Sequence, residues 1–198
     1  MGDTGAEVMT GSNQIVSENS KESEDIPLEG IKHPLQNVWS FWMFMNEKRN
    51  WEENLIELTT FDTVEDYWCL YHHMKLPSEL RMGQDYAVFK KGICPKWEDR
   101  GNKKGGRWLI TIDKKSMNMD RIWMYVVLML IGENFENSDS ICGAVVNVRV
   151  KSKVGIWVSD SKNEKAIKKV GRKLKENLQI PGKISFHEHD SVTNLYTV

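Results

Sequence analysis

Three segments of the chain repeat apolar residues at the spacing of an α-helix that packs along one face. Each segment begins with a residue type that accepts hydrogen bonds from free backbone N–H groups: Thr63 in a Thr-x-x-Asp box, Asp120, and Ser161 in a Ser-x-x-Glu box. Gly132 and Pro181 follow two of these segments, and both residue types end helices. The pattern predicts helices over residues 63–73, 120–131 and 161–177.

Eight shorter segments are rich in β-branched and aromatic residues and lie between turn-like stretches, which is typical of strands. They span residues 38–44, 55–60, 86–90, 107–113, 141–151, 153–159, 184–189 and 193–198. The predicted strands come in pairs and threes between the helices. This order indicates an antiparallel sheet with helices packed on one face, which is an α+β architecture.

The charged residues are nearly balanced over the whole chain but unevenly placed along it. The 198 residues carry 27 basic and 28 acidic side chains, and the net charge of −1 excludes a uniformly basic nucleic-acid coat protein. Residues 1–30 hold seven acids, one base and no aromatic residue, so we expect a disordered acidic N-terminal tail with a net charge of −6. Residues 31–198 then carry +5 and suit one folded domain.

A basic stretch within this domain favours a polyanionic partner. Residues 149–175 hold ten bases against two acids, a local charge of +8. Part of this stretch belongs to the third predicted helix, and half or more of its lysines can equally form the solvated face of that helix. The charge alone therefore leaves both interpretations open.

The sequence lacks the features that several classes of protein require. The longest apolar run, residues 122–131, is half of the ~20 residues that a membrane-spanning helix requires, and residues 1–30 show no secretory signal. The three cysteines, Cys69, Cys94 and Cys142, have no metal-ligand or disulfide spacing, which favours reduced thiols in the cytosol or nucleus. We expect no metal site, no membrane association and no catalytic centre.

Eight tryptophans are more than a core of this size needs. Trp39, Trp108 and Trp123 lie in apolar segments, and we expect them in the core. Trp51 and Trp97 lie instead in polar loops, where a large ring is either an incidental surface residue or a platform for stacking. The acid that follows Trp97, Glu98, is either solvated or able to accept two N–H bonds from the edge of a guanine.

The order of several blocks closely resembles the mRNA cap-binding translation initiation factor 4E family. The blocks are HPLQNVWSFWMF, FDTVEDYW, PKWEDRGNKKGGRWLI, MLIGENF, ICGAVVNVRVK and IWVSD. They cover residues 33 to about 175, nearly the entire expected domain. The resemblance implies a strongly curved sheet of eight antiparallel strands, with three helices on its convex face.

By this resemblance, the concave face holds a 7-methylguanosine cap, for which 7-methyl-GTP is the simplest ligand. Trp51 and Trp97 match the two rings that sandwich the base, and Glu98 matches the acid that reads its N1 and N2 edge. Trp157 matches the residue that packs on the N7-methyl group. Methylation makes the base cationic, so stacking gains a cation–π contribution of ~0.5–2 kcal/mol that unmethylated guanine lacks.

The resemblance also assigns residues to the phosphate bridge of the cap. Arg149 and Lys151 match phosphate-binding positions, and Lys153 is expected in the same role. Arg107 and Asn147 match supporting positions, which reach the phosphates through water or hold Arg149. The family needs no cofactor and no enzymatic step, so binding is the expected activity.

A second site is implied on the convex face, where the family docks a helix with a Tyr-x4-Leu-hydrophobic pattern. The matching positions are His33, Pro34, Val64, Trp68 and Leu128. Scaffold factor 4G and 4E-binding repressor proteins compete for this site in the family. Trp68 can equally be a core residue.

Three departures from the family pattern suggest a specialised isoform. Tyr125 stands where the family usually has a Glu that pairs with the docked peptide, the loop between Arg149 and Trp157 is one residue shorter, and the segment FHEHDSVTNLYTV is shorter than the family's C-terminal region. We expect a monomeric factor that recruits capped mRNA through scaffold factor 4G, located in the cytoplasm with the nucleus as a second location. The alternatives are an isoform that recruits a repressor, and an interaction module that uses the convex groove and has little cap affinity.

Overall fold

The structure is a computed structural model, and it describes residues 1–2, 30–113, 115–191 and 193–198. The predicted N-terminal tail, residues 1–30, lies almost wholly outside the described residues. The chain divides into Met1–Ile31 and a compact unit, Lys32–Val198, and the second unit contains all the described helices and strands. Within the described parts of the chain, no helix is both long and apolar enough to cross a membrane.

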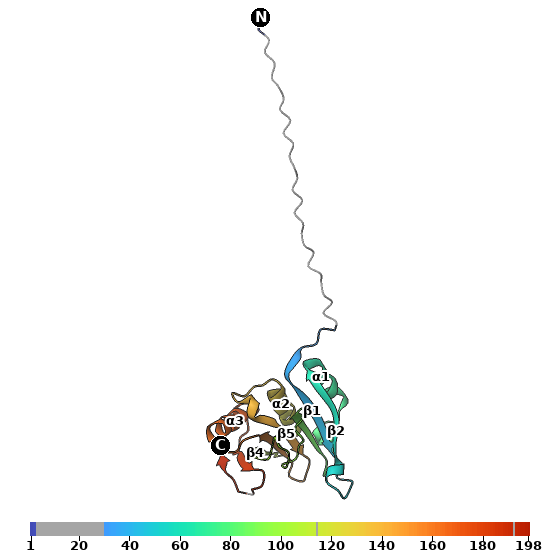
Figure 1. Cartoon of the computed structure of the whole chain (residues 1–198), viewed down its shortest axis with the longest axis vertical. Helices are drawn as coiled ribbons and strands as arrows, with labels where there is room; N and C mark the ends of the chain where they lie inside the picture. Colours follow the sequence, from blue (N-terminus) through green and yellow to red (C-terminus); the bar gives the residue numbers. More distant parts are fainter. Residues whose placement is uncertain (3–29, 114, 192) are drawn as a thin grey trace. The chain divides into compact units, whose positions relative to one another are not determined.

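All strands of the described residues form one antiparallel sheet, with the order β2-β1-β3-β5-β6-β4-β7-β8. Its eight strands and the three α-helices confirm the predicted α+β architecture, and the curved sheet is open (Figure 1). The strands are β1 (Pro34–Phe44), β2 (Leu55–Thr63), β3 (Asp85–Lys90), β4 (Gly106–Thr111), β5 (Ile141–Asn147), β6 (Lys153–Val158), β7 (Ser185–Glu188) and β8 (Tyr196–Thr197).

The helices occur where the apolar pattern predicts them, but two of the predicted N-caps are wrong. Thr63 does cap α1 by accepting a hydrogen bond from the backbone N–H of Asp66. Asn118 caps α2 in place of Asp120, and Asn163 caps α3 in place of Ser161. The helices are α1 (Val64–His73), α2 (Met119–Ile131) and α3 (Glu164–Leu178), with short 3-10 helices at η1 (Glu52–Asn54), η2 (Pro77–Glu79) and η3 (Ser138–Ser140).

The two rejected caps have tertiary partners instead. Asp120 accepts two hydrogen bonds from Ser78, one from its backbone N–H and one from its hydroxyl group. The hydroxyl group of Ser161 donates to Glu188 at 2.8 Å. Asn118 and Asp120 could both cap α2, and Ser161 and Asn163 could both cap α3. The contacts of Asp120 and Ser161 with distant residues leave Asn118 and Asn163 as the caps.

Two predicted strands are four residues shorter in the structure, whereas the ends of the others differ by less or extend further. The fifth was predicted to run to residue 151 but ends at Asn147, because the chain turns there and the Ser152 hydroxyl group bonds the backbone of Arg149. The last was predicted over residues 193–198 but is described only as Tyr196–Thr197. The earlier turn places Arg149 in a loop beside the end of the sheet.

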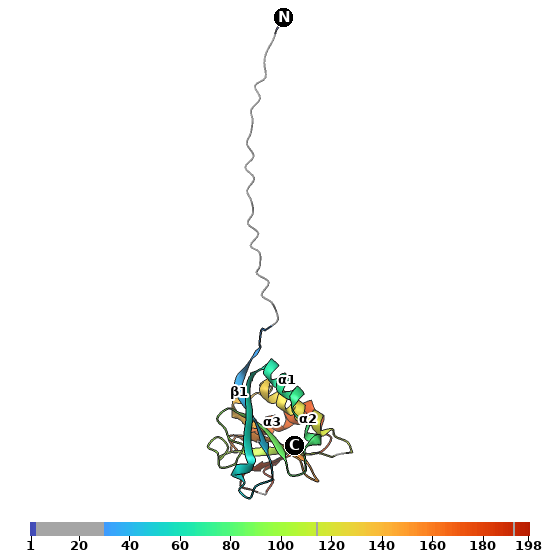
Figure 2. The same cartoon turned by 90° about the vertical axis from the view of Figure 1, so that its right-hand side faces the viewer.

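The helices and one face of the sheet enclose a single large core. Trp39 and Trp108 are fully buried and Trp123 is 2% exposed, as their apolar sequence contexts predicted. Figures 1 and 2 show the helices gathered on one side of the strands. The buried side chains of α2 and α3 belong to the same cluster as those of β1, β4 and β6, so all of them cover this face.

The opposite face of the sheet carries three rows of side chains that run across the strands. Strand pairing sets directly opposite one another, in successive rows, Phe44–Asp85–Asn147–Lys153–Thr111, Trp42–Ala87–Val145–Gly155–Leu109–Ser185, and Ser40–Phe89–Gly143–Trp157–Arg107–His187. Because residues alternate between faces along a strand, every member of these rows points away from the helices. This face is therefore free to build a binding site.

A glycine inside α3 lets that helix approach the sheet closely. A Cβ atom at Gly171 would lie 2.4 Å from the ring of Trp108, nearer than van der Waals contact allows. The Trp108 indole N–H donates to the carbonyl of Ile167 at 3.0 Å, which fixes the ring under the helix. Glycine in a helix costs about 1 kcal/mol relative to alanine, and here the close packing requires it.

We therefore expect Gly171→Ala to destabilise the protein, although alanine is the better helix former. The added methyl group must displace a fully buried ring, and such overpacking costs about 1–3 kcal/mol. Urea unfolding followed by circular dichroism measures the change in the free energy of unfolding. Gly182→Ala is the matched control, because a Cβ atom there meets nothing within 4 Å. Equal stability of the two variants would contradict the close-packing account.

Candidate functional site

A pocket of about 520 Å³ opens on the face of the sheet that the helices leave bare. Strands β3, β5, β6 and β4 form its floor, and the loops that follow β1 and β3 form its walls. The residues that line it are Phe44, Trp51, Glu52, Leu55, Asp85, Tyr86, Ala87, Pro95, Lys96, Trp97, Glu98, Arg107, Leu109, Val145, Asn147, Gly155 and Trp157. Six of the nine residues predicted to bind the cap are among them.

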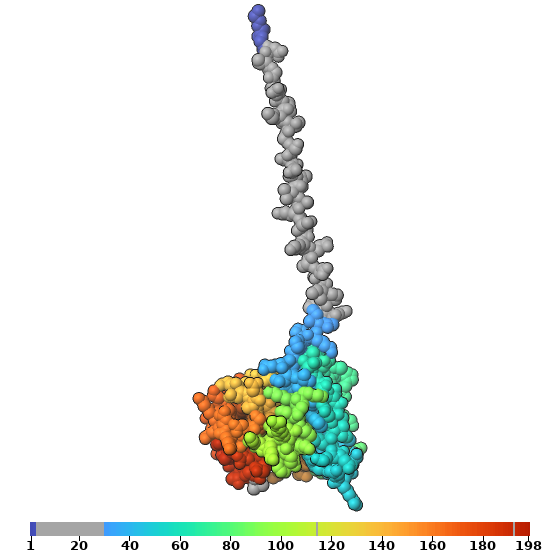
Figure 3. Space-filling view, viewed as in Figure 1, coloured from blue at the N-terminus to red at the C-terminus, as the bar shows by residue number. Residues whose placement is uncertain are grey.

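One wall is the loop between β1 and β2, residues 45–54, which projects at the lower right of Figure 3. Asn54 is 3% exposed, and its side chain holds the loop together from inside. The side-chain oxygen accepts hydrogen bonds from the backbone N–H groups of Glu47 and Lys48, and the side-chain NH₂ group donates to two backbone carbonyls of the loop. Trp51 is 45% exposed, and its ring packs against that of Phe44 with the ring centroids 5.7 Å apart. The ring is thus both accessible and supported.

The facing wall is a loop after β3, residues 94–102, and it has a similar internal tie. Asn102 is fully buried and donates to the carbonyls of Cys94 and Lys96 at 2.8 Å each. The carboxylate of Asp99 accepts the N–H groups of Cys94 and Gly101. The loop therefore holds its shape while Trp97 stays 49% exposed.

The floor of the pocket is aromatic around Trp157. This residue is 6% exposed, meets Phe89 edge-on at 5.4 Å between ring centroids, and has the guanidinium of Arg107 5.8 Å from its ring. The ring of His189 lies 4.1 Å from it. Burial lowers the pKa of Arg107, so its charge stands in a poorly solvated place where an anion is attracted strongly.

His189 was placed by the sequence only within an unusual C-terminal segment, and its stacking on Trp157 was not foreseen. Both ring nitrogens are buried without a hydrogen-bond partner among the described residues. Burial, with the positive charge of Arg107 as a smaller cause, lowers the pKa of His189 to about 4, while Asp190 acts in the opposite direction. The imidazole is therefore neutral at pH 7.

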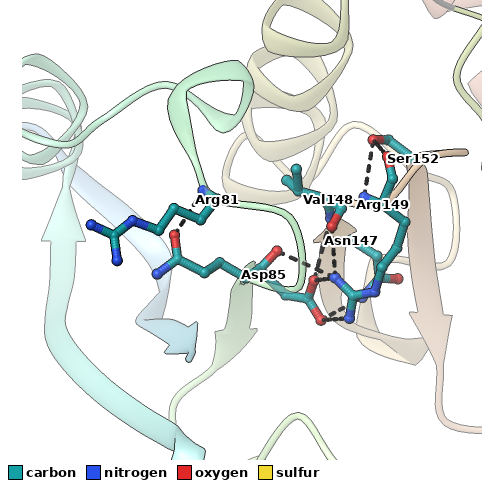
Figure 4. Close-up of polar contacts among 7 residues, drawn as sticks. Arg81, Asp85, Asn147, Val148, Arg149 and Ser152 are labelled. Atoms are coloured by element: carbon teal, nitrogen blue, oxygen red, sulfur yellow. Dashed lines mark hydrogen bonds and ion pairs between the residues drawn. The ribbon is translucent and has the colours of Figure 1, made fainter. Parts of the chain in front are cut away.

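A cluster of charged and polar groups lies at one end of the pocket (Figure 4), where Asp85 and Asn147 line the pocket and Arg149 lies outside the lining. Arg149 donates to both carboxylate oxygens of Asp85, at 2.6 and 3.0 Å, and Asn147 donates to the same carboxylate at 2.8 Å. The family resemblance implied that Asn147 either reaches the phosphates through water or holds Arg149, and here Asn147 and Arg149 donate to the same carboxylate, that of Asp85. Asp85 was missed, although an acid within the apolar strand DYAVFK was a signal for a buried polar contact.

The two lysines predicted to bind phosphate lie differently. Lys153 begins β6 opposite Asn147, in the same row as Asp85, so it shares the face of the pocket. Lys151 lies in the exposed turn between β5 and β6 and does not line the pocket. Arg149 and Lys153 are not among the lining residues either, so all three cations lie outside the pocket lining, with Arg149 and Lys153 beside Asp85 and Asn147, which do line it.

The pocket combines two kinds of recognition element. Trp51 and Trp97 offer large exposed ring faces, and the Glu98 carboxylate has no hydrogen bond or ion pair among the described residues. A planar ring that bears positive charge and an edge with N–H groups would satisfy these three groups together. The basic end would then attract an anionic extension of the same ligand.

Of the residues predicted to bind a protein partner, Val64, Trp68, Tyr125 and Leu128 lie on α1 and α2, and His33 contacts α1. The carbonyl of His33 accepts the N–H of Val64, and the His33 ring bonds Glu65 at 2.6 Å, which joins the start of β1 to α1. Val64 is 37% exposed and Trp68 is half-buried. The others are placed with Pro34 exposed on β1, Leu128 half-buried on α2, and Tyr125 exposed beneath the guanidinium of Arg121.

Comparisons with known proteins agree on one family. The profile described as "Eukaryotic initiation factor 4E" matches residues 34–196. Eukaryotic translation initiation factor 4E of Aplysia californica is 50% identical over 183 residues, which are 85% of this chain and 85% of that protein.

Two solved structures share the fold. Ascaris suum eIF4E-3 with an m7G cap is 41% identical with a TM-score of 0.82, over 85% of this chain and 98% of that one. The complex of C. elegans eIF4E-3 with the 4E-binding protein Mextli and a cap analog is 38% identical with a TM-score of 0.80, over 85% of this chain and all of that one.

The environment of His189 predicts a pH dependence of stability. The unfolded chain binds a proton near pH 6.5 and the folded one only near pH 4, so the free energy of unfolding should fall as pH drops between these values. With partial solvent access, we expect a loss of about 1–2 kcal/mol. Replacing His189 by Phe keeps the stack and should flatten this part of the profile, measured by urea unfolding at pH 7 and pH 5. Parallel profiles for the two proteins would refute it.

Proposed function

The chain belongs to the eukaryotic initiation factor 4E family, and on that premise we propose that it binds the 7-methylguanosine 5′ cap of mRNA and recruits the mRNA to the translation initiation complex. The cap-binding domain in this proposal is residues 31–198. The observation that carries the proposal is the pocket in which two exposed indoles and the unpaired carboxylate of Glu98 meet. The activity is binding, without a catalytic step, and the expected place of action is the cytoplasm.

The two tryptophans recognise the methylated base through their faces. Stacking contributes ~1–3 kcal/mol for each base, and a cationic ring between indoles adds a cation–π attraction. Trp51 is supported by Phe44 and Trp97 by its tied loop, so little side-chain entropy is lost when the base enters. Trp157 forms the adjacent floor, where the methyl group of the base can pack.

Glu98 gives the pocket its preference for guanine. Its carboxylate can accept the N1 and N2 hydrogens of the base as two parallel hydrogen bonds, as it would from an Arg fork. The delocalised positive charge of 7-methylguanine strengthens these bonds. One methyl group therefore acts on both the stacking and the edge contacts, which is why GTP should bind far more weakly.

The basic end of the pocket binds the phosphate bridge. Asp85 holds the Arg149 guanidinium at the end of the sheet, and Lys153 lies in the same row of the sheet. Lys151 extends this cationic end into solvent, and the poorly solvated Arg107 attracts the phosphates from the floor. Affinity should fall as salt rises, because these contacts are electrostatic.

The helix side of the molecule is proposed to dock a partner. His33, Pro34, Val64, Trp68 and Leu128 form the binding positions for a Tyr-x4-Leu-hydrophobic helix of scaffold factor 4G or of a 4E-binding repressor. Apolar side chains with exposed edges suit an amphipathic helix. Tyr125 stacks with Arg121 and brings no acid to this surface, so it alters which charged partners are accepted.

Cap binding is tested by titrating the protein with 7-methyl-GTP and GTP while its tryptophan fluorescence is followed. We expect strong quenching by the methylated nucleotide and little by GTP. Because hydrogen bonds to a charged group are worth about 1.5–3 kcal/mol each, Glu98→Gln should weaken 7-methyl-GTP at least tenfold. Asp139→Asn, which changes an acid outside the pocket, is the control. Normal affinity of both Glu98→Gln and Trp97→Leu would refute the site.

Partner docking is tested separately with Val64→Glu. An acid in the first turn of α1 suits the helix, so the variant should fold, while its charge disrupts apolar docking. We expect at least tenfold weaker binding of a peptide with the Tyr-x4-Leu-hydrophobic pattern, measured by calorimetry, and unchanged 7-methyl-GTP affinity. A variant that bound the peptide normally would place the partner elsewhere.

A further inference from the structure

The two tryptophan loops are joined at the mouth of the pocket by an ion pair. Lys96 Nζ donates to Glu52 Oε1 at 3.2 Å, across 44 residues of sequence. Glu52 directly follows Trp51 and Lys96 directly precedes Trp97, and both charged residues line the pocket. Among the described residues, no other hydrogen bond or ion pair connects loop 45–54 to loop 94–102.

We propose that the Glu52–Lys96 pair is a clasp that fixes the distance between the two loops that carry the indoles and keeps the Lys96 ammonium away from Glu98. The inference rests on the proposed cap-binding function. Each loop is tied internally by its own buried asparagine, Asn54 or Asn102, so each moves as a unit. The internal hydrogen bonds do not fix the distance between loop 45–54 and loop 94–102. The Glu52–Lys96 pair is the contact that joins the two loops, so it sets that distance.

The clasp also controls the charge beside the base. The hydrogen bond from Lys96 to Glu52 raises the pKa of Lys96, and the field of Glu98 acts on the same ammonium in the same direction. Two carboxylates therefore compete for one cation. With Glu52 present, the pair is neutral and Glu98 stays available to the ligand. Without Glu52, the ammonium can turn to Glu98 and also repel a cationic ring.

This competition predicts unequal effects of the two partners. Lys96→Gln loses the clasp but also the competing cation, so 7-methyl-GTP should bind within about threefold of the wild type, in keeping with the small effect of an exposed pair. Glu52→Gln loses the clasp and frees the ammonium, and we expect about tenfold weaker binding. In the double variant the cation is absent again, so affinity should return to that of Lys96→Gln.

Fluorescence titration with 7-methyl-GTP measures all three variants, and the Glu52→Gln/Lys96→Gln cycle gives the coupling between the residues. Glu57→Gln is the matched control: its pair with Lys91 has the same 3.2 Å length but lies outside the pocket, and its affinity should not change. A charge swap, Glu52→Lys with Lys96→Glu, should recover affinity to within about twofold of the wild type. Independent, additive effects of the single substitutions would overturn the clasp.

A second measurement does not depend on the nucleotide. In the ligand-free protein, Glu52→Gln should speed hydrogen–deuterium exchange in residues 45–54 and 94–102, while Glu57→Gln should not. Unchanged exchange in both loops would refute the clasp even if cap binding is established. Failure of the wild type to bind 7-methyl-GTP, with faster exchange in Glu52→Gln, would instead count against the proposed function and leave the clasp supported.

Discussion

The antiparallel register of the sheet is the constraint on which the rest of the structure depends. Side chains alternate between the faces of a strand, so a shift of one residue would turn every row over. In the observed register, the large apolar residues of β1, β4 and β6 meet the helices, and Asp85, Asn147 and Lys153 line up on the other face. One sheet thereby supports a core on one side and a polar pocket on the other.

The pocket divides its tasks between a fixed floor and two projecting walls. The floor belongs to the sheet, where Trp157 is packed against Phe89 and His189. The walls are loops, but the buried amides of Asn54 and Asn102 satisfy their backbone groups from within. Exposed rings on internally bonded loops combine access for a ligand with a low entropic cost of ordering.

Charged side chains that would compete with a ligand are paired with one another, whereas the carboxylate that is proposed to bind the ligand is unpaired. Asp85 orients Arg149 by two hydrogen bonds, and Glu52 occupies Lys96. Glu98 has no such partner among the described residues, and its carboxylate is open to a ligand. A ring that carries positive charge and an anionic extension therefore finds complementary groups at the two ends of one pocket.

The amino-acid sequence by itself determined what depends on neighbours in the chain. The helical stripes, the places of the strands though not all of their ends, the buried Trp39, Trp108 and Trp123, and the polar loops around Trp51 and Trp97 all follow from local pattern, and they were predicted correctly. The family blocks supplied the expectation of eight antiparallel strands with three helices, which the structure confirms, and the candidate site residues, which stay a prediction.

The tertiary structure alone decided the contacts between distant segments. The Asp85–Arg149 pair, the ring of His189 against Trp157 and the Glu52–Lys96 clasp each join residues far apart in the chain, and no local pattern encodes such a distance. The same competition explains why two predicted helix caps are wrong, since Asp120 and Ser161 bind remote partners and Asn118 and Asn163 cap the helices. Local propensity allows several residues to form a given cap or contact. Packing selects among them, because the energies of burial and of charge pairing depend on segments that come together only in the folded protein.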